Sequence, residues 1–191
     1  MKILTGRLCG QTILFKPNEH LRPTTDKTRK AIFDMLQGAI EKKRVLDLFS
    51  GTGALGFEAL SQGASHVTFV EHDAAQCKKI SENLGRWKFE GSVEVCHDET
   101  LHWLRRQMPK KQLFDFVFFD PPYATDLAVR TLEEISAAGL VSRGGFVVLE
   151  CRRKDDVPKH TGTLGAVREK RYGQTKVMIY AAKSEPVEGS F

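Results

Sequence analysis

The 191-residue sequence predicts an α/β fold with a mostly parallel sheet. From residue 45 onward, short apolar runs typical of buried strands alternate with longer stretches whose apolar residues recur at helical spacing. The last two runs flank Gly173 like a hairpin, which adds a reversed strand to an otherwise parallel sheet. We therefore expect seven strands, with right-handed connections and helices on both faces of the sheet.

The expected elements follow one another in regular order. The strands are expected at residues 45–49, 66–71, 92–96, 116–120, 146–150, 164–172 and 176–182. The helices between them are expected at residues 55–62, 74–87, 99–108 and 126–138. This alternation is typical of a sheet that binds ligands at the carboxyl ends of its strands.

The first forty residues are expected to form a small extension of this fold. Two short extended pieces, 2–5 and 12–15, predict a hairpin. A helix should begin after Pro23, where a threonine can cap it and Asp26 favours the positive end of its dipole. We thus expect an N-terminal extension over 1–40, a main domain over 41–183 and a frayed tail over 184–191.

Composition places the chain among globular proteins. Hydrophobic residues make up 41% and charged residues 28%, and no apolar run approaches the roughly 18 residues that a membrane helix needs. The N-terminus lacks the apolar segment of a secretory signal, so we expect a cytoplasmic protein with no membrane partner. Four cysteines and six histidines show no ligand spacing, so neither a disulfide framework nor a metal site is expected.

Charge is distributed unevenly along the chain. The net charge is +5, and residues 1–40 and 151–191 each contribute +4 while residues 41–150 contribute −3. This distribution is expected if the core holds a small cofactor while the flanks meet a polyanion. Solvated surface lysines would give the same pattern.

A glycine-rich loop follows the first expected strand. Gly51, Gly53 and Gly56 allow a tight turn and a close approach of the backbone to a ligand. About twenty residues further on, Glu71 ends the second strand, where a carboxylate can hold ribose hydroxyls. The pair indicates a nucleoside cofactor, but the loop alone does not separate a nicotinamide enzyme from an S-adenosylmethionine enzyme.

Acidic residues at other strand ends favour S-adenosylmethionine. Asp47 precedes the glycines, where a carboxylate could meet an amino group but would repel a pyrophosphate. Asp98 follows the third strand and could accept a hydrogen bond from the exocyclic amine of adenine. Each acid also has an ordinary interpretation as a cap or surface charge.

The chemistry is expected at the end of the fourth strand. There a buried apolar run ends at Asp120, and Pro121 and Pro122 prevent further strand pairing, which leaves backbone carbonyls without ladder partners. Tyr123 adds a flat aromatic face. Such a group of residues could hold a planar base by its exocyclic amine, and an ordinary Pro-Pro turn after a strand is the alternative.

These motifs resemble motifs I, II and IV of class I S-adenosylmethionine-dependent methyltransferases that modify exocyclic amines. The wider pattern resembles the RsmD family, bacterial enzymes that methylate N2 of a guanine in small-subunit ribosomal RNA. It comprises Gly6-Arg7, the run 21–26 with Arg29 and Phe33, and Gly53-Ala54-Leu55-Gly56 followed by Glu58-Ala59-Leu60. The resemblance covers nearly the whole chain and departs at Lys30, where the family commonly carries Glu.

The resemblance implies a Rossmann-like fold, S-adenosyl-L-methionine as cofactor, and ribosomal RNA or the small ribosomal subunit as the partner of a monomer. The cofactor-binding residues that it implies are Asp47, Phe49, Gly51, Gly53, Glu71, His72 and Asp98, with Glu71 on the ribose and Asp98 at the adenine. The residues that would hold the guanine are Asp120, Pro121, Pro122 and Tyr123. The residues near the mouth of the site, where they would contact RNA or support the cofactor, are Arg7, Arg22, Thr24 and Arg29.

Other functions fit parts of the same pattern. A DNA adenine or cytosine methyltransferase also uses Asp-Pro-Pro-Tyr, although the chain shows no target-recognition insert. A catalytically idle RNA-binding assembly factor would keep the same fold, but intact acids at four strand ends argue against such decay. A nicotinamide oxidoreductase is more distant, because hydride transfer has no need of the motif at residue 120.

Overall fold

The computed structural model describes residues 1–17, 24–36, 38–89, 93–107, 112–122 and 126–183. The eight strands are β1 (Arg44–Leu48), β2 (His66–Glu71), β3 (Val93–His97), β4 (Phe114–Phe119), β5 (Val141–Arg152), β6 (His160–Thr161), β7 (Leu164–Tyr172) and β8 (Thr175–Ala182). The helices are a 3-10 turn η1 (Gly6–Leu8) and the α-helices α1 (Asp26–Met35), α2 (Ala54–Ser61), α3 (Ala74–Trp87), α4 (Thr100–Gln107) and α5 (Leu127–Ala137).

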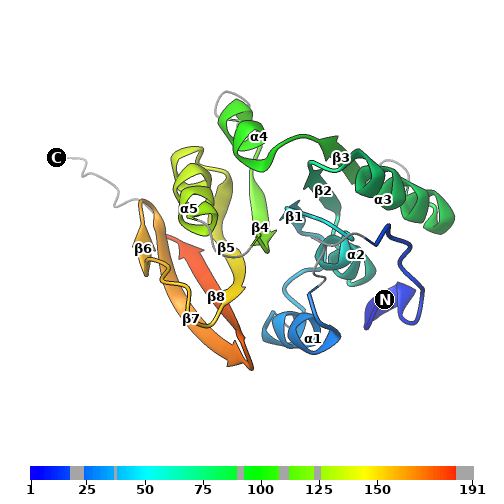
Figure 1. Ribbon diagram of the computed structural model, residues 1–191, viewed down its shortest axis with the longest axis horizontal. Coiled ribbons are helices and arrows are strands. Elements are labelled where there is room, and N and C mark those ends of the chain that lie inside the picture. Colours follow the sequence, from blue (N-terminus) through cyan, green and yellow to red (C-terminus); the bar gives the residue numbers. More distant parts are fainter. Residues whose placement is uncertain (18–23, 37, 90–92, 108–111, 123–125, 184–191) are drawn as a thin grey trace.

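All eight strands form one sheet in the order β3-β2-β1-β4-β5-β8-β7-β6 (Figure 1). The five strands from β3 to β5 are parallel, and β8, β7 and β6 are antiparallel to their neighbours. The predicted α/β fold with a reversed C-terminal hairpin is therefore confirmed, with one strand more than expected. The extra strand β6 has two residues, which is too short to give a sequence pattern.

Apolar side chains fill both faces of the sheet. One core lies between the sheet and α1, α2 and α3, and includes Phe33, Phe57, Phe69 and Phe118. The other lies between the sheet and α4 and α5, and includes Trp103. Sheet and helices thus form three layers, and the central strands are buried on both sides, which explains their continuous apolar runs.

The N-terminal hairpin is present in reduced form. Lys2 and Thr12 form a single antiparallel bridge around the 3-10 turn. Ile3 and Ile13 lie in the same core as α2 and α3, so the extension packs into the main fold. The expected frayed tail, 184–191, lies outside the described residues.

The carboxyl ends of the central strands lie side by side. Leu48 of β1 pairs with Val70 of β2 and with Phe119 of β4, and Glu71 pairs with His97 of β3. The residues that follow these strands therefore meet at one edge of the sheet, as expected for a ligand site in a parallel α/β fold. No helix among the described segments is long and apolar enough to span a membrane.

Candidate active site

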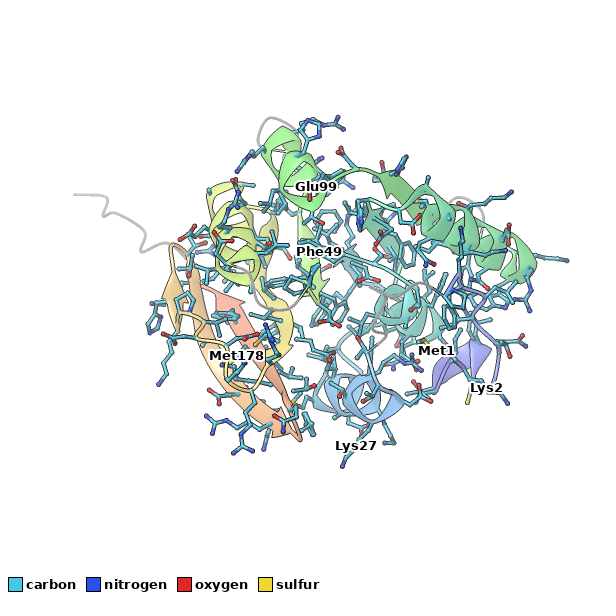
Figure 2. All side chains as sticks on the ribbon, viewed as in Figure 1. Met1, Lys2, Lys27, Phe49, Glu99 and Met178 are labelled. Atoms are coloured by element: carbon cyan, nitrogen blue, oxygen red, sulfur yellow. The ribbon has the colours of Figure 1, made fainter. Side chains whose placement is uncertain are left out.

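The loop between β1 and α2 reverses the chain through left-handed conformations. Phe49 has φ 53° and Gly51 has φ 51°, and Gly53, with φ 75°, caps α2. Phe49 is not a glycine, so this conformation is strained and has to be held by its surroundings. The Ser50 hydroxyl does so, because it donates to the Asp47 carbonyl (2.6 Å) and accepts from the N–H of Val70 (3.1 Å). Figure 2 shows Phe49 near the middle of the molecule.

Asp47 is the most deeply buried acid of the site. Its side chain is 2% exposed, and its Oδ2 accepts a 2.9 Å hydrogen bond from the N–H of Gly56 in the first turn of α2. Burial raises the pKa of Asp47 to about 8; the hydrogen bond from Gly56 opposes this shift and the nearby charge of Glu71 adds to it. Asp47 thus lies directly beneath the glycine loop and can carry a proton at neutral pH.

Glu71 connects the two halves of the loop region. It is 4% exposed, and its Oε2 accepts from the N–H of Gly51 at 2.7 Å. Its Oε1 accepts from the N–H of Asp73 at 2.8 Å and lies 3.0 Å from Nδ1 of His72. His72 itself is exposed on the rim of the site. The position predicted to hold a ribose therefore carries a carboxylate fixed by two backbone donors.

Asp98 follows β3 and is already engaged by α4. Its Oδ1 accepts from Nδ1 of His102 (2.8 Å) and from the N–H of Glu99 (2.8 Å), and its Oδ2 lies 3.3 Å from Arg106 Nη2. Burial opposes ionisation of Asp98, but the hydrogen bonds from His102 and Glu99 and the charge of Arg106 outweigh it and lower the pKa of Asp98. A ligand that donates a hydrogen bond to Asp98 would share its carboxylate with His102 and Arg106 of α4.

Asp120 follows β4 at the same edge of the sheet. Its carboxylate is half-buried, and its Oδ2 lies 3.4 Å from the hydroxyl of Thr24, which can donate a long hydrogen bond to it. Thr24 is buried and precedes α1, so the extension reaches the site as expected. Pro121 is buried and Pro122 is exposed, whereas Tyr123 lies outside the described residues.

Arg29 does not lie at an open mouth of the site. The residue is fully buried, and its guanidinium donates to the carbonyl of Lys2 and to Asp26 (3.0 Å) while its Nε lies 3.5 Å from Glu58. Burial lowers its pKa, and the charges of Glu58 and Asp26 oppose that shift. The expectation that Arg29 contacts RNA is therefore corrected, and its role is to hold the extension in place. Arg29 lies between Thr28 and Lys30 in a basic stretch, and nothing in the neighbouring sequence indicates its buried partner Glu58.

Glu58 is a residue whose role the sequence did not reveal. It is 1% exposed and accepts from the N–H groups of Leu4 (3.0 Å) and Thr5 (2.7 Å) and from the Thr5 hydroxyl (2.7 Å). It lies in α2, directly after the glycine loop, so one carboxylate fixes the extension to the helix that begins at the candidate site. A polar residue in the otherwise apolar run 54–60 was the available signal.

The remaining predicted residues are divided between the surface and the undescribed segments. Arg7 is exposed and lies over the ring of Phe89, 4.1 Å from its centroid. Arg22 lies outside the described residues. No group of three or more His, Cys, Asp or Glu side chains in the described part of the chain could hold a metal ion.

Comparison with known proteins places this arrangement in a family. The model of the family described as "Conserved hypothetical protein 95" matches residues 1–181. The chain belongs to this family. The match to the Conserved hypothetical protein 95 family spans the extension, the glycine loop and the motif at Asp120.

Relatives and solved structures agree with this membership. Ribosomal RNA small subunit methyltransferase D of Buchnera aphidicola subsp. Acyrthosiphon pisum is 33% identical over 83% of the chain and 82% of that protein. The protein of the same name from Escherichia coli K12 is 29% identical over 97% of the chain and 91% of its own length. The solved structure of a hypothetical protein from Thermus thermophilus has a TM-score of 0.79 at 30% identity and covers 94% of the chain and 98% of that structure. The resemblance to the RsmD family is confirmed.

Proposed function

We propose that the protein transfers a methyl group from S-adenosyl-L-methionine to the exocyclic N2 amine of a guanine in small-subunit ribosomal RNA. Relatives named Ribosomal RNA small subunit methyltransferase D support the reaction and the class of substrate. The observation that carries the proposal is the position of Asp120-Pro121-Pro122 beside a glycine loop held by Asp47 and Glu71. We further propose that the protein acts as a monomer in the cytoplasm.

The chemistry of the donor set fits this cofactor. The loop is surrounded by carboxylates, and its closest acids, Asp47 and Glu71, are almost fully buried. The Glu71 carboxylate would repel a pyrophosphate, whereas the ammonium and sulfonium groups of S-adenosylmethionine would be attracted and would favour the ionised form of Asp47. In our proposal the residues that bind the cofactor are Asp47, Phe49, Gly51, Gly53, Glu71, His72 and Asp98. An RNA methyltransferase from Salinibacter ruber, with a TM-score of 0.63 at 15% identity, has been solved with S-adenosyl-L-homocysteine.

The bound cofactor supplies an electrophilic methyl group, so the chain's residues mainly have to align the acceptor. Asp120 Oδ and the Pro121 carbonyl would accept hydrogen bonds from the guanine amine and direct its nitrogen lone pair to the methyl carbon. Thr24, 3.4 Å from Asp120, would orient the carboxylate. Such alignment supplies roughly 7–11 kcal/mol of barrier reduction. Tyr123 would stack on the base for about 1–3 kcal/mol, and Arg7 and Arg22 would contact the RNA.

The test is a methylation assay with radiolabelled cofactor on small ribosomal subunits, naked ribosomal RNA and duplex DNA. We expect transfer to a ribosomal substrate by the wild-type protein, and N2-methylguanine among the digested nucleosides. Asp120→Ala should lower transfer by at least about 10²-fold while cofactor affinity, measured by calorimetry, stays nearly unchanged. Transfer to DNA alone would contradict the RNA substrate. Failure to bind the cofactor would indicate an idle assembly factor.

A further inference from the structure

We propose that residues 1–17 and 74–89 together form a surface that binds the phosphate backbone of the substrate RNA. We call this surface the α3 ledge, because α3 is its longest element. The inference rests on the proposed function and extends the RNA-binding surface from Arg7, which belongs to the family motifs, to basic residues outside those motifs. Figure 1 shows the N-terminal segment beside α3, at the end of the sheet formed by β3.

Two buried amide side chains join the segments of the ledge. Asn83 accepts from the N–H of Leu14 (2.9 Å) and donates to its carbonyl (2.7 Å). Gln76, seven residues earlier in α3, makes the same pair of hydrogen bonds to the backbone of Lys16. Each amide side chain bonds both the N–H and the carbonyl of one residue, as a neighbouring β-strand would. The segment is therefore fixed along the helix before any ligand binds, which reduces the entropy lost on binding.

The ledge carries a large excess of positive charge. Its basic residues are Lys2, Arg7, Lys16, Lys78, Lys79, Arg86 and Lys88, and its only carboxylate is Glu82. The ledge thus has a net charge of +6, whereas the whole chain has +5. A surface with this excess of positive charge attracts a polyanion.

Most of these cations lack an acidic partner. Lys79 pairs with Glu82 at 2.6 Å, but the other six basic residues are exposed and form no salt bridge within the described part of the chain. The exposed arginines of α4 differ, because Arg105 pairs with Glu134 (2.7 Å) and Arg106 with Asp98 (3.3 Å). Cations without a carboxylate partner are free to contact phosphates and to release the counterions of RNA.

The ledge leads directly to the candidate active site. Asp73 caps α3 and follows Glu71 by two residues, so Gln76, Lys16 and Lys78 belong to the end of the ledge next to the cofactor loop. From there the 14 residues of α3 extend about 21 Å outward. Figure 2 shows Lys2 at the outer side of the molecule. Contacts to phosphates along this length would fix the register of the RNA, while the site at Asp120 selects the amine.

The test is a triple variant that removes charge without removing a structural contact. Lys16→Gln, Lys78→Gln and Lys88→Gln together change three exposed lysines whose side chains form no hydrogen bond or salt bridge in the described chain. Arg86 is left in place, because it donates to the carbonyl of Thr12. The matched control is Arg143→Gln, Lys159→Gln and Lys183→Gln, which removes the same charge from exposed positions outside the ledge.

Binding of a 16S ribosomal RNA fragment and of small subunits is measured between 50 and 200 mM salt. We expect the triple variant to lower the slope of log K against log salt by about 2–3 and to raise Kd at least about tenfold. KM for the subunit should rise while kcat and cofactor affinity stay near the wild-type values. The control variant should lose much less affinity.

Three outcomes overturn the proposal. In the first, the triple variant keeps the RNA affinity and the salt slope of the wild type. In the second, the control variant loses as much RNA affinity as the triple variant. In the third, the triple variant loses cofactor affinity by the same factor as RNA affinity. Failure of the proposed function is detected separately, in the methylation assay. The wild-type protein would then methylate no RNA, whatever RNA affinities the variants show.

Discussion

The backbone N–H of Gly51 donates a 2.7 Å hydrogen bond to Oε2 of Glu71. This bond joins the loop after β1 to the end of β2, and the second oxygen of Glu71 is held by the N–H of Asp73. The carboxylate is therefore fixed in place by the protein alone. A ligand that binds here meets an acceptor that needs no reorganisation, which favours affinity.

Glu71→Gln should weaken cofactor binding about 10- to 100-fold, because one amide oxygen replaces a charged carboxylate that accepts from two backbone donors and, in the proposed function, from the ribose. The measurement is calorimetric titration with S-adenosylmethionine. Glu94→Gln is the control, since it removes the same charge from an exposed position of β3 and should leave Kd unchanged. Equal affinities for both variants and the wild type would exclude Glu71 from the cofactor site.

Elements with clear local signals could be predicted from the sequence. The bounds expected for β2 and α3 coincide with the observed ones, because an apolar run ends at Glu71 and the Asp73 side chain caps the next helix. β5 begins at Val141, five residues before the expected start at Phe146. Gly144 and Gly145 interrupt its apolar pattern, and the register with β4 shifts between Val141 and Phe146.

Contacts between distant segments could not be predicted in the same way. The acids at the strand ends were found because parallel strands share one edge. Arg29 and Glu58 are 29 positions apart on two helices, and only packing shows that both are buried together. Likewise, nothing in the periodicity of α3 separates Asn83 from an exposed polar residue, although it is fully buried against Leu14.

Arg29→Met should destabilise the protein by about 3 kcal/mol without a loss of RNA affinity in the folded fraction. The change leaves the buried Glu58 carboxylate without its arginine partner, but three other donors still form hydrogen bonds to it. The loss in the free energy of unfolding therefore lies at the lower end of the range for removal of one partner from a buried salt bridge. Urea unfolding measures the effect. Lys30→Met, on the exposed face of the same helix, should change stability by less than about 0.5 kcal/mol. A weaker RNA complex at unchanged stability would show that Arg29 faces the ligand.

Asp47 should make stability fall as pH rises from about 4 to about 8. Its pKa is raised to about 8 in the folded protein from an ordinary value of 3.8, so between these values the folded state binds a proton that the unfolded state has lost. The free energy of unfolding then decreases by at most about 1.4 kcal/mol per pH unit and levels off above pH 8. Urea unfolding at pH 5, 6, 7 and 8 should show this slope in the wild type and lose it in Asp47→Asn. Parallel curves for the two proteins would mean that Asp47 is ionised throughout.

Gly56→Ala should destabilise the site even though alanine favours helices. A Cβ at this position would lie 2.2 Å from Cε1 of Phe69 and 3.0 Å from Oδ2 of Asp47, so α2 or the aromatic ring has to move. We expect a loss of about 1–3 kcal/mol in the free energy of unfolding, together with weaker cofactor binding, because the shift separates Gly56 from the Asp47 carboxylate. Gly85→Ala is the matched control, since a Cβ there meets no atom of the described chain within 4 Å; in α3 it should stabilise the protein by about 0.5–1 kcal/mol. If both variants were stabilised, α2 would have space for a Cβ at position 56. The close contacts of Gly56 with Phe69 and Asp47 would then not exist in solution.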